Sequence, residues 1–208
     1  MKDLIIKDIL NLKRQAKLVL VFAVLYGVMS FYMEDASFVS GIIIFMCAMF
    51  SVSSFAYDDM AKWDKYALSM PLSRKDIVMS KYILIFILAL AGALLSFVMN
   101  ITVSIVSKMP FNPMEKLLET LAIVGISLIF TSVLTPLIYK FGTEKARILI
   151  ILVFVIPAIL FSVLANLGFQ LPSEGTLKVI ATISPIIIIA IIFISYLISL
   201  SIYRKKEM

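Results

Sequence analysis

The chain contains no histidine, a single cysteine and few charged residues, and these shortages exclude several classes of function. Without histidine there is no imidazole general base, no histidine-bound metal and no Cys–His nucleophile pair. Cys47 has no second cysteine to pair with, so a disulfide framework is excluded. None of the seven glycines belongs to a GxxxxGKS or GxxxxGKT sequence, so the chain cannot hydrolyse ATP through a P-loop of its own. We therefore predict that it is not an enzyme and has no catalytic residue, cofactor or metal of its own.

The composition is that of an integral membrane protein. Apolar residues make up 62% of the 208 positions, charged residues 15%, and the mean hydropathy is +1.08. A membrane β-barrel would alternate apolar and polar residues, whereas the stretch IIIIAIIFISYLISL is apolar on every side. The sequence therefore predicts an all-α polytopic membrane protein, with residues 1–208 forming a single transmembrane domain.

Six apolar runs are long enough to be transmembrane helices, and none has a formal charge near its middle. A helix needs about 20 apolar residues to cross the hydrocarbon layer. The predicted spans cover residues 18–33, 37–57, 82–107, 117–139, 148–166 and 179–203.

The positions of the basic residues predict the orientation of these spans. If the N-terminus is cytoplasmic, all but three of the 19 Lys and Arg residues fall on the cytoplasmic side, the exceptions being Lys108, Lys116 and Lys178. Basic loops resist translocation, and an even number of spans places both termini in the cytoplasm. The net charge of +6 is explained by this topology, so we do not expect a nucleic-acid partner.

Residues 1–17 have the pattern of an amphipathic helix. Ile5, Ile9 and Leu12 share one stripe, and Lys7 faces away from it. This predicts an interfacial helix on the inner leaflet of the lipid bilayer, and a frayed basic tail is the alternative.

The last outside connection, residues 166–184, is moderately apolar but contains Gly168, Pro172 and Gly175. The pattern predicts a break followed by a short, partly re-entrant helix, whose irregular backbone would need cover from protein or a wet cavity.

The most polar part of the chain is residues 58–81, a cytoplasmic segment between spans two and three that carries the only tryptophan. Trp63, Tyr66, Ala67 and Met70 follow helical spacing with charges of both signs around them. Pro71 ends this helix, and in the next one Ser73 takes the N-cap position with Asp76 at the capping-box position. An aromatic stripe inside a charged rim is typical of a docking surface. A loop lying on lipid headgroups, anchored by its aromatic rings, is the alternative.

Polar and small residues inside the spans allow two interpretations. Ser54, Asn100 and Ser104 could line a substrate path, although hydrogen bonding between helices is the more common role. Ala89, Gly92, Ala93 and Ser96 let two helices approach closely, either within the chain or between subunits.

The sequence resembles the permease subunits of bacterial ABC-2 type transporters over its whole length. The resemblance rests on FAYDD at the end of span two, on WDKYALSMPLSRKDIVMSKY after it, and on KFGTEKAR after span four. The most specific part is the family pattern of Leu-Pro, Ser-Arg, Ile-Val and Ser-Lys. These pairs fall at Met70-Pro71, Ser73-Arg74, Ile77-Val78 and Ser80-Lys81, with Met70 where leucine is commoner.

This resemblance implies a multi-pass protein of the bacterial cytoplasmic membrane that works with a separate ABC ATP-binding subunit, which would hold the ATP and Mg²⁺. A second permease copy or a related chain would complete the export path. The coupling helix that contacts the ATP-binding subunit would comprise Asp59, Lys62, Trp63, Tyr66, Ala67 and Met70. Pro71, Ser73, Arg74 and Lys81 would join it to span three. Gly142, Glu144, Lys145 and Arg147 would form a second cytoplasmic contact.

The resemblance also implies an amphipathic or hydrophobic cargo: a peptide, an antimicrobial compound or a lipid. Two other functions fit a small protein with six spans. One is the substrate-binding membrane component of a vitamin importer, and the other is an immunity protein that binds a toxin peptide. An ATP-binding subunit that copurifies with the chain would argue against the immunity protein.

Overall fold

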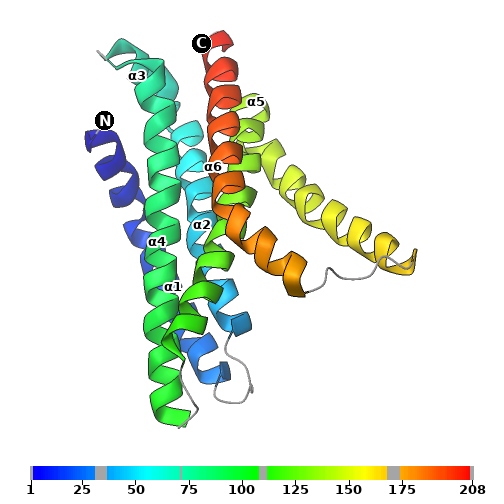
Figure 1. The fold of residues 1–208 in the computed structure, drawn as a ribbon. Helices are drawn as coiled ribbons and strands as arrows, with labels where there is room; N and C mark the ends of the chain where they lie inside the picture. The colour runs from blue at the N-terminus through cyan, green and yellow to red at the C-terminus, as the bar shows by residue number, and fades with distance from the viewer. Residues whose placement is uncertain (1, 31–36, 71, 108–111, 168–173, 207–208) are drawn as a thin grey trace.

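The computed structural model describes residues 2–30, 37–70, 72–107, 112–167 and 174–206, and these residues form six α-helices and no strand. The helices are α1 (Lys2–Ser30), α2 (Ser37–Met60), α3 (Trp63–Ser69), α4 (Arg74–Ser107), α5 (Pro113–Asn166) and α6 (Glu174–Lys205). The start of α1, the short helix α3 and the end of α6 lie at one end of the bundle, here called the α3 end (Figure 1). The all-α prediction is confirmed for the described residues.

Four helical segments are long and apolar enough to cross a membrane: Val39–Met60, Arg74–Val106, Pro113–Ala146 and Thr182–Lys205. Two further predicted spans correspond to shorter apolar helices, Lys17–Met29 and Ile148–Leu160. The chain is therefore a multi-pass membrane protein.

Helix α5 contains two of the predicted spans, joined by a sharp bend at Gly142. The backbone there has φ 78° and ψ 168°, a conformation that glycine adopts without the steric cost of a Cβ. Residues 113–141 form the first limb of α5 and residues 143–166 the second limb. The second limb and the first part of α6 lean away from the other helices (Figure 1).

Helix α1 differs from its prediction, because no boundary separates residues 1–17 from the first apolar run. The sequence has no proline before the end of α1 and no glycine before Gly27, so no residue there breaks the helix. Its buried stripe is Leu4, Asp8 and Leu12, whereas Ile9 is exposed. Leu12 of the predicted stripe therefore packs within the protein, while the contact of the exposed apolar side chains with the inner leaflet stays a prediction.

Residues 168–173, within the predicted re-entrant segment, lie outside the described residues. From Glu174 onward the chain is part of α6, which continues through Pro185. The short helix expected before the last span is thus continuous with that span.

Small residues bring α4 close to α2. A Cβ added to Gly92 would lie 2.9 Å from the Cβ of Cys47 and 3.0 Å from the Cα of Ile44, and Ala89 is fully buried. The small-residue stripe of α4 therefore packs within the chain. The sequence allowed two interpretations of this stripe, packing within the chain and a subunit interface. The contact with α2 supports packing within the chain.

We expect Gly92→Ala to destabilise the protein by about 1–3 kcal/mol, because the added methyl group meets backbone that cannot move aside. The matched control is Gly41→Ala in α2, where an added Cβ would meet nothing within 4 Å. This control should be neutral or stabilising by up to about 1 kcal/mol, since alanine favours the helix. Unfolding in mixed detergent micelles, followed by circular dichroism, compares the two variants. Equal effects would show that the contact is not tight.

Candidate functional site

Local sequence explains why α3 is short and where α4 begins. Lys62 adopts a left-handed conformation, with φ 49°, and turns the chain from α2 into α3. Met70 is extended, as expected for a residue before a proline, and so ends α3. The Ser73 hydroxyl lies 2.6 Å from the Asp76 carboxylate and accepts the Asp76 backbone N–H at 3.1 Å. The predicted capping box is confirmed, while Pro71 lies outside the described residues.

The two sides of α3 have different surroundings. Ala67 is fully buried, and Trp63 is partly buried against the core at the α3 end. Tyr66 and Met70 are 62% and 45% exposed, and Lys62 is exposed as well. We call Lys62, Tyr66 and Met70 the α3 face. Of the residues predicted to contact a partner, Trp63 and Ala67 therefore pack against the rest of the protein. The α3 face forms the outer surface of α3.

Polar contacts tie α3 to α1 and α6. The ammonium group of Lys7 lies 4.1 Å from the centre of the Trp63 ring, a cation–π contact. The Asp64 carboxylate accepts hydrogen bonds from the Tyr203 hydroxyl at 3.1 Å and from Lys206 at 3.0 Å. Movement of α3 would therefore act directly on two helices that are far from it in the sequence.

Beneath α3 lies a group of buried and partly buried charges, here called the four-charge cluster: Lys7, Asp8, Asp58 and Lys81. Lys81 reaches Asp8 at 3.0 Å and Asp58 at 2.5 Å, and Lys7 reaches Asp58 at 2.7 Å and Asp8 at 3.2 Å. Lys81 also donates to the Ser54 hydroxyl at 2.8 Å. The side chains of Lys81 and Asp8 are only 5% and 1% exposed. The formal charges cancel, as they must for charges buried this deeply.

Sequence reasoning assigned Lys81 to the connection with span three and missed Asp8. A signal was present, because Asp8 lies four residues after Leu4 and four before Leu12, in line with two buried apolar residues. An acid inside an apolar stripe needs a partner, and here the partners are Lys81 of α4 and the neighbouring Lys7 of α1.

Arg74 joins the start of α4 to the end of α6. Its guanidinium donates to the backbone carbonyl of Tyr203 at 3.2 Å and to that of Arg204. Carbonyl groups in the last turn of a helix have no partner within that helix and attract cations. Arg74, which we predicted to join the coupling helix to span three, therefore also holds this connection against α6.

The bend in α5 also lies at the α3 end. Asp59 of α2 accepts the backbone N–H of Thr143 at 3.0 Å and so caps the second limb of α5. Gly142, predicted to belong to a second cytoplasmic contact, lies in this bend. Glu144 and Lys145 beside it are exposed. The side chain of Arg147 lies outside the described residues.

Two of the three polar residues predicted to line a path or to pack between helices, Asn100 and Ser54, make buried hydrogen bonds. The Asn100 amide donates to the Ser40 hydroxyl at 2.8 Å, and both residues are buried. Ser54 is buried and belongs to the surroundings of Lys81, while Ser104 is partly exposed. These contacts favour packing for Asn100 and Ser54 and leave the role of Ser104 a prediction.

A small cavity of about 20 Å³ lies between Asp58, Asp59, Asp64 and Tyr139. The Tyr139 hydroxyl is buried and has no hydrogen-bond partner among the described residues. We expect Tyr139→Phe to be neutral or to stabilise the protein by about 1–2 kcal/mol, because it removes an unsatisfied polar group. Tyr203→Phe is the matched control: it removes a bond to Asp64 and should destabilise by about 1–3 kcal/mol. Denaturant unfolding checks both, and a loss of stability in Tyr139→Phe would contradict this account.

Within the part of the chain that the structure describes, no group of three or more metal-ligating side chains could hold a metal ion. A bundle of apolar helices with a short, polar-rimmed helix at one end is the architecture of a multi-pass membrane component.

A comparison with protein-family models identifies this component. The model described as ABC-2 family transporter protein matches residues 3–204. The chain therefore belongs to the ABC-2 family of transporter proteins, which are non-catalytic membrane components that normally work with an ATP-binding subunit. Searches of curated proteins and of solved structures gave no match.

Proposed function

We propose that this chain is the permease subunit of an ATP-driven exporter in the bacterial cytoplasmic membrane, with six spans and both termini in the cytoplasm. In this proposal, α3 is the coupling helix and the α3 face contacts the ATP-binding subunit, which holds ATP and Mg²⁺. The observation that carries the proposal is the exposure of Tyr66 and Met70 on a short helix whose opposite side packs against the core. A patch of apolar side chains with a charged neighbour suits a protein interface.

The contacts beneath α3 supply a mechanism for coupling. When ATP closes the nucleotide subunits, α3 moves with them. Asp64 then carries this displacement to the end of α6, and Trp63 carries it to Lys7 and the four-charge cluster. The cluster links α1, α2 and α4, so that these helices move as a unit. Such rigid-body movement changes the side of the membrane from which a path is open.

A second permease copy or a related chain completes the path in this proposal. The second limb of α5 leans away from the other helices and leaves Ile148, Ile151 and Ile156 more than half exposed (Figure 1). We assign the second copy to this limb. The cargo is an amphipathic or hydrophobic peptide, an antimicrobial compound or a lipid, in keeping with the apolar spans.

The test is a mild-detergent pull-down of the tagged chain from its native membrane, with mass spectrometry and an ATPase assay of the product. We expect a stoichiometric P-loop subunit and vanadate-sensitive ATP hydrolysis. A matched preparation from cells that lack the chain controls for contaminating ATPases. Recovery of the chain alone, without ATPase activity, would overturn the proposal and favour a peptide-binding immunity role.

A further inference from the structure

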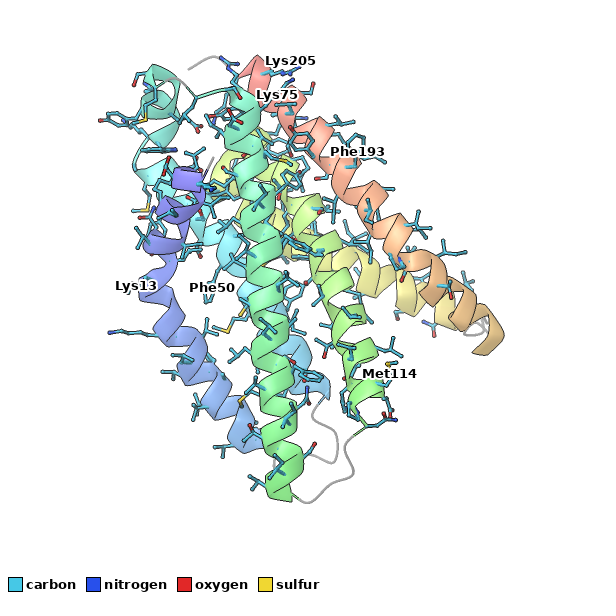
Figure 2. The ribbon with its side chains drawn as sticks, turned by 60° about the vertical axis from the view of Figure 1, so that its left-hand side comes forward. Lys13, Phe50, Lys75, Met114, Phe193 and Lys205 are labelled. Atoms are coloured by element: carbon cyan, nitrogen blue, oxygen red, sulfur yellow. The ribbon has the colours of Figure 1, made fainter. Side chains whose placement is uncertain are left out.

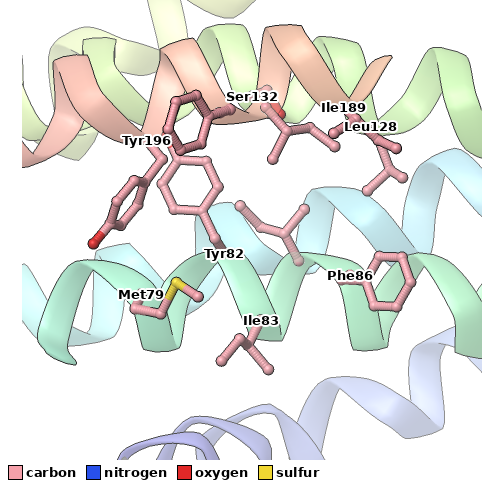
Figure 3. A pocket seen from close by; sticks show the side chains of 11 residues that line it. Met79, Tyr82, Ile83, Phe86, Leu128, Ser132, Ile189 and Tyr196 are labelled. Carbon is pink, nitrogen blue, oxygen red and sulfur yellow. The ribbon is translucent and has the colours of Figure 1, made fainter. Parts of the chain in front are cut away.

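An apolar groove of about 430 Å³ lies between α4 and α6 and is floored by the first limb of α5. Figure 3 shows Met79 and Tyr196 toward one end of it, and Phe86 and Leu128 toward the other. Its volume falls in the range of small-molecule and lipid-tail sites.

The hydroxyl group of Tyr82, in the wall of the groove, is hydrogen-bonded within the protein. The Tyr82 hydroxyl lies 2.6 Å from the Ser195 hydroxyl and 2.9 Å from that of Ser199, and Ser195 donates to the Ser132 carbonyl at 2.5 Å. A molecule bound in this part of the groove therefore contacts apolar side chains. The hydroxyl of Tyr196 points toward the Met79 end (Figure 3). The groove is thus apolar along its length and polar at one end.

That polar end is also basic. Lys75 lies one helical turn before Met79 on the same face of α4, and Arg204 lies three turns after Phe193 on the same face of α6. Figure 2 shows Lys75 at the α3 end of α4 and Phe193 further along α6. Both basic side chains are exposed, and neither has a partner among the described residues. The bond from Arg74 to the Arg204 carbonyl holds the two helix ends together.

We infer that this groove binds an anionic phospholipid from the leaflet at the α3 end. One acyl chain lies along Phe86, Ile83 and Phe193, and the phosphate group meets Lys75 and Arg204. Basic side chains near the membrane surface attract anionic headgroups, and the apolar wall of the groove accommodates an acyl chain. A polar cargo does not fit this apolar wall, and a second protein copy would leave the two cations without a counter-charge.

Fluorescence quenching by brominated lipids tests this inference. The natural tryptophan is removed by Trp63→Phe, and a reporter is placed in the groove by Phe86→Trp. The matched control is Leu94→Trp, which lies on the same helix, is 70% exposed and does not line the groove. Each protein is reconstituted in phosphatidylcholine vesicles that contain a small fraction of phosphatidylglycerol with brominated acyl chains. Size-exclusion chromatography and circular dichroism verify that each variant is folded.

We expect the groove reporter to be quenched several-fold more than the control. Adding Lys75→Gln and Arg204→Gln should lower the preference for phosphatidylglycerol over phosphatidylcholine by roughly thirtyfold. Equal quenching of the two reporters, or equal quenching by brominated phosphatidylcholine, would overturn the inference. Protection of the groove reporter from both lipids would show that protein covers the groove and would also overturn it. The assay uses no ATP-binding subunit, so its result is independent of the proposed export function.

Discussion

Replacing Lys81 with methionine is expected to lower the free energy of unfolding by about 3–5 kcal/mol, the largest effect on stability that we predict for a single substitution. Methionine has a similar length, so little packing is lost. The cost arises because Asp8, with a side chain that is 1% exposed, would lose its closest cation while remaining buried. Asp58 keeps Lys7 at 2.7 Å and is affected less.

Two further variants separate this explanation from a general effect of the substitution. Lys75→Met changes an exposed lysine on the same helix and should alter the stability by less than about 0.5 kcal/mol. Adding Asp8→Asn to Lys81→Met removes the buried negative charge and should restore at least about 1–2 kcal/mol. Unfolding in mixed detergent micelles gives all three values. If Lys75→Met and Lys81→Met cost the same, the four-charge cluster does not stabilise the folded protein.

The helices could be predicted from the sequence because each depends on neighbouring residues. The apolar runs gave the approximate positions of the four helical segments long enough to cross a membrane and of the two shorter apolar helices, and the Ser73–Asp76 spacing gave the start of α4. These features use contacts within a few residues, where composition and period are decisive.

The contacts around α3 could not be predicted in the same way, since their partners are distant in sequence. Lys81 and Asp8 are 73 residues apart, and Asp59 caps a helix at a separation of 84 residues. The sequence shows where the carboxylates are, but the packing of the helices determines which group each carboxylate contacts. The side of α3 that Trp63 faces depends on packing as well, which is why an aromatic residue predicted as a docking contact supports the helix from beneath.

Substituting Tyr66 and Met70 together with alanine is expected to weaken capture of the ATP-binding subunit at least about thirtyfold and to lower transport. Truncating a central aromatic residue of an interface commonly costs about 2 kcal/mol or more. Both side chains are exposed and are not assigned to the core cluster that holds α3, so the permease should remain folded. Binding of the purified ATP-binding subunit to the reconstituted permease gives the affinity. Unfolding in micelles verifies the fold.

The controls are chosen so that loss of binding is assigned to the α3 face. Tyr66→Phe keeps the ring and should retain most of the affinity. Met114→Ala removes an exposed methionine far from α3, toward the other end of the bundle, and should have no effect (Figure 2). Trp63→Ala should reduce stability as well as binding, because its ring lies on the core beside Lys7. Unchanged affinity in the double variant would mean that the ATP-binding subunit meets another surface, with Glu144 and Lys145 at the bend of α5 the next to examine, since their side chains are exposed at the same end.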